Sequence, residues 1–300
     1  MDTMHFYLSA APVPAILLSA VLIASCAGMS EPVGELRKET MFAVTADMEL
    51  VKFNAGQPQR FLSRQKISGL GAGEKLVGID FRVARGVLYA LAGNGRLYTL
   101  DSATAVLKPV GSAPSALPLT GTLFGFDFNP AADRIRVVSD SGQNLRLHPD
   151  TGAAVDGNAT LDGVQGDAAL VYAEGDANAG KAPAIVAAGY TYNKQDEKIT
   201  TNFALDRRLG ILVMQGSREG VVPVVSPNTG RLTTVGPLGL GELVDAAFDI
   251  ADVSGAAFAA VRTVGAPRTR LYLINLTNGR AELIGTVGDG AAVLGMAVEP

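Results

Sequence analysis

The stretch Leu76-Val77-Gly78-Ile79-Asp80-Phe81 decides the fold that this sequence predicts. It is short and apolar, and turn-forming residues flank it, which is typical of a strand buried on both faces. Four variants of it follow along the chain at residues 123–128 (LFGFDF), 165–170 (QGDAAL), 243–248 (LVDAAF) and 293–298 (VLGMAV). Because the copies are about 40 to 50 residues apart, with one wider gap, they indicate a repeat architecture.

Each copy opens a unit of further short strands. After the first copy come Val87–Leu91, a hairpin turn at Asn94-Gly95, and the strand-like segments Arg96–Asp101 and Val106–Gly111. Four successive antiparallel strands within ~45 residues are typical of one blade of a β-propeller, in which the innermost strands surround a central axis. The sequence therefore predicts an all-β propeller over residues 41–300.

The number of copies predicts five blades of four antiparallel strands. The first unit, Met41 to about Ile67, has no innermost copy before it, whereas the copy Val293–Val298 has no unit after it. We expect this C-terminal strand to close the first blade, because closure removes exposed strand edges. The wide interval contains an additional hairpin-like piece, Arg218–Gly236, which we interpret as an insertion. The alternative is that this piece belongs to a degenerate sixth blade.

The N-terminus has the pattern of a targeting segment. Residues 1–25 contain an apolar run, Ala15–Ala24, which is too short for a helix that crosses ~30 Å of hydrocarbon. The run leads into Leu-Ile-Ala-Ser-Cys, and its last residue, Cys26, is the only cysteine of the chain. This resembles a bacterial lipobox and predicts that Cys26 is lipidated; the alternative is an ordinary signal peptide. Residues 26–40 are small, polar and charged, as a flexible tether is.

The predicted lipid anchor would attach the protein to a membrane. We therefore expect a membrane as a binding partner and the bacterial cell envelope as the location. Ala27, rather than an aspartate, follows the cysteine, and this favours the outer membrane, with the protein facing the periplasm. The chain has 25 basic and 29 acidic residues and no basic cluster. Nucleic acid is therefore not an expected partner, because phosphates require a concentrated basic face.

Several strings of the predicted blades occur together in one known family. They are Gly78-Ile79-Asp80-Phe81, Leu88-Tyr89-Ala90-Leu91, Gly125–Pro130 (GFDFNP), Arg134–Ser139 (RIRVVS) and Asn144-Leu145-Arg146. With them, the chain from about Met41 to Pro300 resembles the bacterial family catalogued as domain of unknown function 4394. The resemblance implies a secreted or envelope-attached protein of propeller type. It supplies no activity and no catalytic residues.

Asp80 and Asp127 occupy equivalent positions in adjacent copies. Because innermost strands line the axis of a propeller, these carboxylates are expected to approach one another and to hold a divalent cation or shift each other's pKa. The alternative is a structural role in which they bond neighbouring backbone. In the other three copies the equivalent residue is an alanine, namely Ala169, Ala247 and Ala297. Asp167 and Asp245 share a different repeat position and would extend a polar lining.

Other catalytic chemistry has little support. Outside the signal segment His148 is the only histidine, and no serine lies in an elbow motif, so neither a histidine-rich metal site nor a Ser-His-Asp site is expected. We therefore predict a non-catalytic, lipid-anchored propeller scaffold that binds a protein partner or a small ligand. The alternative is a metal-dependent hydrolase or lactonase-like enzyme with its site at the propeller axis. No cofactor is expected apart from a divalent cation at Asp80 and Asp127.

Overall fold

The computed structural model describes residues 1–5, 31 and 33–300. By compactness the chain divides into Met1–Glu31 and Pro32–Pro300. Most of the predicted signal segment and the predicted lipidation site, Cys26, lie outside the described residues. Within the described part of the chain, no helix is long and apolar enough to cross a membrane.

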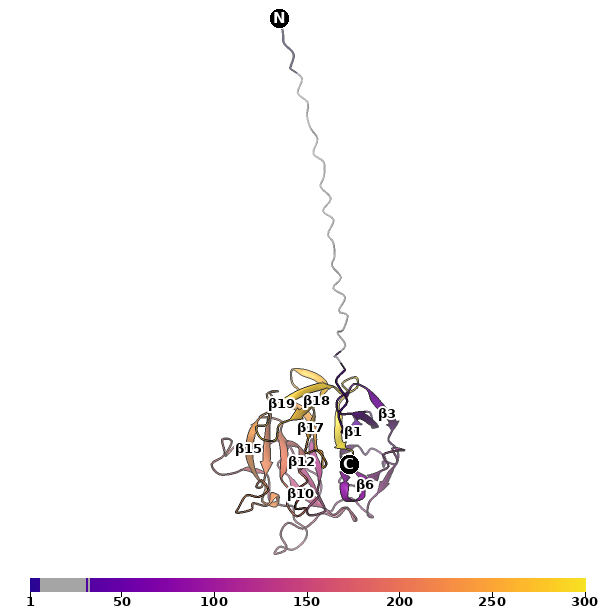
Figure 1. The fold of residues 1–300 in the computed structure, drawn as a ribbon, viewed down its shortest axis with the longest axis vertical. Coiled ribbons are helices and arrows are strands. Elements are labelled where there is room, and N and C mark those ends of the chain that lie inside the picture. The colour runs from indigo at the N-terminus through magenta and orange to yellow at the C-terminus, as the bar shows by residue number, and fades with distance from the viewer. Residues whose placement is uncertain (6–30, 32) are drawn as a thin grey trace. The chain divides into compact units, whose positions relative to one another are not determined.

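The second unit is a five-bladed β-propeller, as the repeats predicted (Figure 1). The innermost strands contact one another in the order β20 (Val293–Val298), β4 (Leu76–Arg82), β8 (Phe124–Asn129), β12 (Ile185–Tyr190) and β16 (Leu243–Ile250). Because β16 contacts β20 again, the ring is closed. The first blade contains β20 (Val293–Val298), β1 (Thr40–Thr45), β2 (Glu49–Asn54) and β3 (Phe61–Lys66). The second contains β4 (Leu76–Arg82), β5 (Val87–Ala92), β6 (Leu97–Leu100) and β7 (Leu107–Pro109).

The remaining three blades vary in their number of strands. The third contains β8 (Phe124–Asn129), β9 (Arg134–Ser139) and β10 (Asn144–Leu147). The fourth contains β12 (Ile185–Tyr190), β13 (Asn202–Asp206), β14 (Ile211–Gln215), β15 (Arg231–Pro237) and β11 (Val171–Tyr172). The fifth contains β16 (Leu243–Ile250), β17 (Ala257–Thr263), β18 (Ala266–Ile274) and β19 (Ala281–Thr286). Two short 3₁₀ turns are η1 (Val83–Arg85) and η2 (Pro227–Thr229).

The C-terminal strand closes the first blade, which confirms that prediction. β20 pairs antiparallel with β1, and Val298 lies opposite Met41. In Figure 1 the yellow C-terminal strand accordingly lies beside β1. The two ends of the propeller sequence thus share one sheet, and the innermost edge of the first blade is paired rather than exposed.

The third blade has three strands instead of the expected four. A single bridge, Leu147 to Ala154, takes the place of the fourth strand. Two backbone bonds flank it, from the His148 N–H to the Ala153 carbonyl and from the Val155 N–H to the Arg146 carbonyl, each 2.8 Å long. The pairing stops there because Asp156-Gly157 begins a turn directly afterwards.

The fourth blade corrects the alignment of the repeats. Its innermost strand is the fully buried β12, not the predicted stretch Gln165–Leu170, which lies outside the strands. The chain instead reaches this blade at its outer edge, where β11 pairs parallel with β15. The segment Arg218–Gly236 is therefore no insertion, because most of β15 falls within it and forms the fourth strand.

Glycine recurs in the innermost strands because their backbones pass close to one another near the axis. A Cβ on Gly125 would lie 2.7 Å from the backbone nitrogen of Ala188, and one on Gly295 would lie 2.7 Å from that of Ile79. Real Cβ contacts are essentially never shorter than 3.0 Å. Any larger residue at these two positions would force neighbouring blades apart.

Candidate metal centre

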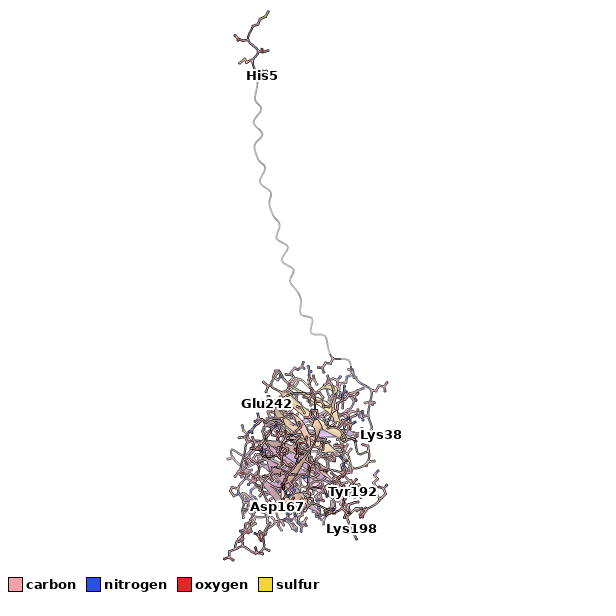
Figure 2. The ribbon with its side chains drawn as sticks, turned by 90° about the vertical axis from the view of Figure 1, so that its left-hand side faces the viewer. His5, Lys38, Asp167, Tyr192, Lys198 and Glu242 are labelled. Carbon is pink, nitrogen blue, oxygen red and sulfur yellow. The ribbon has the colours of Figure 1, made fainter. Side chains whose placement is uncertain are left out.

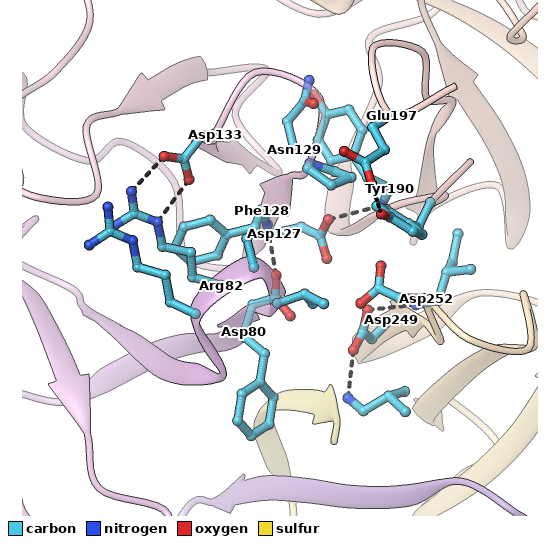
Figure 3. A pocket seen from close by; sticks show the side chains of 18 residues that line it. Asp80, Arg82, Asp127, Phe128, Asn129, Asp133, Tyr190, Glu197, Asp249 and Asp252 are labelled. Atoms are coloured by element: carbon cyan, nitrogen blue, oxygen red, sulfur yellow. Dashed lines mark hydrogen bonds and ion pairs between the residues drawn. The ribbon is translucent and has the colours of Figure 1, made fainter. Parts of the chain in front are cut away.

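Three aspartates from three different blades meet at the axis. They are Asp80 of β4, Asp127 of β8 and Asp249 of β16, and their exposed fractions are 6%, 3% and 7%. One carboxylate oxygen of each lies within 4.8 Å of those of the other two. Figure 3 shows the three carboxylates pointing into a common space. The structure thus brings the two predicted residues together and adds a third.

Backbone amides of the neighbouring innermost strands hold these carboxylates in place. The Phe128 N–H donates to Asp80 Oδ2 over 2.7 Å, and the Tyr190 N–H donates to Asp127 Oδ2 over 2.8 Å. In the same way, the Val298 N–H donates to the Oδ2 atom of Asp249 over 2.6 Å. The structural role considered from the sequence is therefore present, and it orients the carboxylates toward the axis.

These bonds also identify the equivalent positions of the repeat. Each aspartate accepts from the residue that follows its equivalent in the next blade, so the equivalents in β12 and β20 are Gly189 and Ala297. Ala169 and Ala247 were wrong equivalents. The position in the fifth blade belongs to Asp249, two residues beyond Ala247, because aligning the copies by their first residue puts this copy two residues out of step with those of β4 and β8.

The sequence contained a signal for the third aspartate. Phe248-Asp249-Ile250 has the same apolar-Asp-apolar order as Ile79-Asp80-Phe81 and Phe126-Asp127-Phe128. Aligning this central triplet, rather than the start of each copy, would have found Asp249.

An open pocket of about 490 Å³ lies directly over the three carboxylates. Tyr190, Tyr192, Glu197, Asp252 and Arg85 contribute to its walls. Arg82 lies on the side opposite Glu197 and Asp252 (Figure 3). None of these residues was predicted from the sequence, because they lie at strand ends and in loops without a recognisable motif. The pocket therefore gives the aspartates access to a ligand.

The axis is closed on the other side of the aspartates. The next space along the innermost strands measures only about 10 Å³, room for a single water molecule at most. Its lining is mostly apolar and includes Ile79, Phe126, Phe248, Leu294 and Met296. The aspartates therefore form the floor of a pocket rather than part of a through channel.

No basic side chain within the described residues forms an ion pair with the three aspartates. Arg82, an arginine in the pocket wall, forms ion pairs with Asp133 and Asp150 instead. Its Nε atom donates to Asp133 Oδ1 over 2.8 Å, and the side chain is 4% exposed. The three carboxyl groups at the floor therefore have no ion-pair partner among the described residues.

Burial and mutual repulsion change the ionisation of these carboxyl groups. Burial raises the pKa of Asp80 well above its ordinary value, and the nearby charge of Asp249 raises it further. Burial and then the charge of Asp80 raise the pKa of Asp127 in the same way. Burial raises the pKa of Asp249 to about 6, and burial together with Asp249 raises the pKa of Asp252 to about 7. A bound cation would favour the ionised forms.

The geometry suits a hard cation with oxygen ligands. Because the three oxygens lie within 4.8 Å of one another, a point between them is at most ~2.8 Å from each, which is compatible with the 2.3–2.6 Å of calcium–oxygen bonds. Magnesium demands shorter bonds of ~2.1 Å and a stricter octahedral geometry, and zinc prefers nitrogen and sulfur ligands. Calcium therefore fits this donor set best.

The other acidic positions considered from the sequence do not line the pocket. Asp167 is paired with Arg136 and Arg146 at 2.6 and 2.7 Å. Asp245, at the opposite end of β16, is paired with Arg262. His148 does not line the pocket either, and its Nδ1 atom accepts from the Asp150 N–H in a turn.

Among known proteins, this chain is similar to one family and to a solved structure. No curated protein matches the sequence. A solved structure of a structural-genomics protein of unknown function from Bacteroides thetaiotaomicron is similar, at 15% identity and a TM-score of 0.42. The match covers 77% of this chain and 58% of that chain. The model of a family described as domain of unknown function, DUF4394, matches residues 49–297, and the chain therefore belongs to this family.

Proposed function

We propose that this protein is a lipid-anchored envelope protein whose propeller binds a small polar ligand through a calcium ion held by Asp80, Asp127 and Asp249. The observation that carries the proposal is the convergence of three buried carboxylates, without an ion-pair partner among the described residues, at the floor of an open pocket. Like-charged groups in a buried site destabilise each other, and a cation removes that repulsion.

The ligand would complete the coordination of the cation from the pocket side. Three carboxylate oxygens leave several of the six to eight positions of calcium open. Oxygen atoms of a carboxylate, phosphate or hydroxyl group entering the pocket would fill them. Tyr190 and Tyr192 would contact the remainder of the ligand from the wall.

Titration of the chelated protein with calcium tests the site directly. We expect one ion per chain by calorimetry and a rise in melting temperature. Asp249→Asn should weaken the affinity on the order of 100-fold, because it removes one charged ligand. The matched control is Asp245→Asn, which removes a carboxylate paired with Arg262 at the other end of the same strand. Equal affinity in the Asp249 and Asp245 variants would exclude the site.

The anchor is tested separately. Intact mass analysis of protein extracted from bacterial membranes should show an acylated N-terminal Cys26, and Cys26→Ser should release the protein from membranes. Fractionation should place the lipidated form in the outer membrane, facing the periplasm. A mature protein that keeps an unmodified Cys26 would contradict the anchor and leave the calcium test unaffected.

Metal-dependent hydrolysis is a second candidate, favoured by Asp252. This residue lines the pocket beside Asp249, and its pKa of about 7 suits a general base near neutral pH. The bound cation would polarise an ester or lactone carbonyl, and Asp252 would accept a proton from the attacking water. Calcium-dependent turnover of lactones or aryl esters that Asp252→Asn abolishes, with calcium binding retained, would establish the enzyme. If turnover with calcium is no faster than in chelated protein, the enzyme hypothesis fails and only the binding function remains.

A further inference from the structure

An exposed apolar tip lies in the connection between β14 and β15. In the sequence Val221-Val222-Pro223-Val224-Val225, three valines are largely exposed, at 46% for Val221, 87% for Val222 and 77% for Val224. Clustered apolar residues that are held in water usually mark a surface that meets a partner or a membrane.

The structure holds this tip in place. The Ser217 N–H donates to the Val225 carbonyl over 2.9 Å, and the Val225 N–H donates back to Ser217 Oγ over 3.0 Å. The Arg218 guanidinium lies over the Phe203 ring, 5.3 Å from its centre, and donates to the Leu276 carbonyl over 3.2 Å. These contacts therefore fix the position of the segment that carries the exposed valines.

The tip is on the face of the propeller that contains the axial pocket. The Glu219 N–H donates over 3.0 Å to Thr201, at the end of the segment that contributes Tyr192 to the pocket wall. In the same segment, Lys194 Nζ donates over 2.7 Å to the carbonyl of Val253, another valine that is 70% exposed. The valine tip and Val253 thus lie on the face to which the pocket opens.

The chain also enters the propeller on this face. Residues 34–39, the last part of the predicted tether, are bound to it: Asn54 Nδ2 donates to the Arg37 carbonyl over 2.8 Å, and Ser254 Oγ donates to Glu39 over 2.7 Å. Figure 2 shows Lys38, Tyr192 and Lys198 on one side of the propeller and Glu242 on the other. Gly34 follows Cys26 by eight residues, which span at most ~29 Å when extended.

We infer that this face docks onto the lipid bilayer in which Cys26 is anchored, and that the tip Val221–Val224 enters the interfacial layer. The inference rests on the proposed lipid anchor and is independent of calcium binding. A short tether bound to this face keeps it near the bilayer, and aliphatic side chains without charges gain most by leaving water there. The axial pocket then opens toward the membrane surface.

A fluorescent label reports whether the tip meets lipid. The full chain is purified from membranes and reconstituted into phosphatidylethanolamine–phosphatidylglycerol vesicles, with an environment-sensitive dye on Val222→Cys. Acylation of Cys26 leaves the new cysteine as the reactive one. The matched control is Val264→Cys, which is 69% exposed before mutation and lies beside Glu242, where the Val264 N–H donates to the Glu242 carbonyl.

We expect the dye at position 222 to emit at shorter wavelength and to be quenched by nitroxide-labelled lipid, with no change at position 264. The pair Val222→Asp and Val224→Asp, placed in a Cys26→Ser chain, should reduce sedimentation with the same vesicles about tenfold. Water-like emission at both positions would overturn the inference. Shielding of position 222 in native envelope membranes but not in pure lipid would also overturn it, because the partner would then be a protein.

If intact mass shows no acyl group on Cys26, the proposed anchor fails by itself. The docking face is then decided by adding the same vesicles to the Cys26→Ser chain labelled at position 222. A shift to shorter wavelength supports docking, and an unchanged spectrum excludes it.

Discussion

The two ends of the propeller axis are built by the same five innermost strands, yet they serve opposite purposes. At the closed end, Phe126, Phe248 and Met296 fill the space between the strands and leave about 10 Å³ empty. At the open end, Asp127 and Asp249 follow these phenylalanines by one residue in the sequence and line a pocket of about 490 Å³. One end gains stability from apolar burial, whereas the other holds like charges together at a cost in stability.

This contrast separates stability from binding within single strands. Along β16, Phe248 belongs to the apolar end and Asp249 to the acidic end. Substitutions at the closed end should therefore lower the free energy of unfolding with or without calcium. Substitutions at the open end should change calcium affinity and the pH dependence of stability, with smaller effects on the folded state itself.

The largest effect is expected for Phe248→Ala at the closed end. Phe248 is 3% exposed, and its ring lies against the backbone position of Gly189. Loss of the ring should lower the free energy of unfolding by about 3–5 kcal/mol, measured by urea denaturation. Val264→Ala, on an exposed turn, is the control and should change it by less than about 0.5 kcal/mol. A loss below about 1 kcal/mol at position 248 would mean that the closed end does not carry stability.

The second effect is a fall in stability with rising pH in the calcium-free protein. The folded-state pKa values of Asp249 and Asp252, about 6 and about 7, exceed the ordinary value of 3.8, so the folded protein binds more protons than the unfolded chain. The stabilisation that comes from these extra bound protons is fully present below pH ~4 and is lost as the pH rises through 6 and 7. We expect a loss on the order of 2–4 kcal/mol between pH 5 and 8.

Urea denaturation at the two pH values, with chelator or with saturating calcium, measures this slope. Calcium should flatten it, because the cation stabilises the ionised carboxylates. Stability that rises from pH 5 to 8 in chelated protein would contradict the repulsion that we assign to the open end.

The third effect separates the two roles of Asp127. Both Asp127→Asn and Asp127→Ala should weaken calcium binding on the order of 100-fold, about 2.7 kcal/mol. The asparagine can still accept the Tyr190 N–H, whereas the alanine leaves this buried donor unpaired and should destabilise the fold by a further ~1–3 kcal/mol. Calorimetry and urea denaturation of the two variants provide both numbers. Equal stability of the asparagine and alanine variants would contradict the structural role of Asp127.

The smallest effect is expected at the rim of the pocket. Glu197 accepts a hydrogen bond of 2.9 Å from the Tyr192 hydroxyl in an exposed position. Glu197→Gln should change calcium affinity by roughly twofold or less, because exposed charges contribute at most ~1 kcal/mol. A change as large as that of Asp127→Asn would mean that the rim, and not the floor, binds the cation.

The fold could be predicted where its determinants are local. Short apolar stretches such as Leu76–Phe81 and the turns between them indicate strands and blades, and five units predicted the closed ring. The prediction failed for Gln165–Leu170, because the Gly-Asp of that stretch imitates the repeat. Its aspartate, Asp167, instead pairs with Arg136 and Arg146, which are 31 and 21 residues away, and such a partnership has no local signal.

By itself, the sequence determined the propeller class, the closure by Val293–Val298, and the equivalent positions of Asp80 and Asp127, because a strand pattern repeats every few tens of residues. The sequence also contains the matching triplet Phe248-Asp249-Ile250, but the tertiary structure decided that Asp249 joins them, because its hydrogen bond to Val298 of the next blade fixes its place in the repeat. Tertiary structure also decided that the site is a closed-bottomed pocket with raised carboxyl pKa values. Burial and charge repulsion depend on distances between blades, which no single segment of the chain encodes.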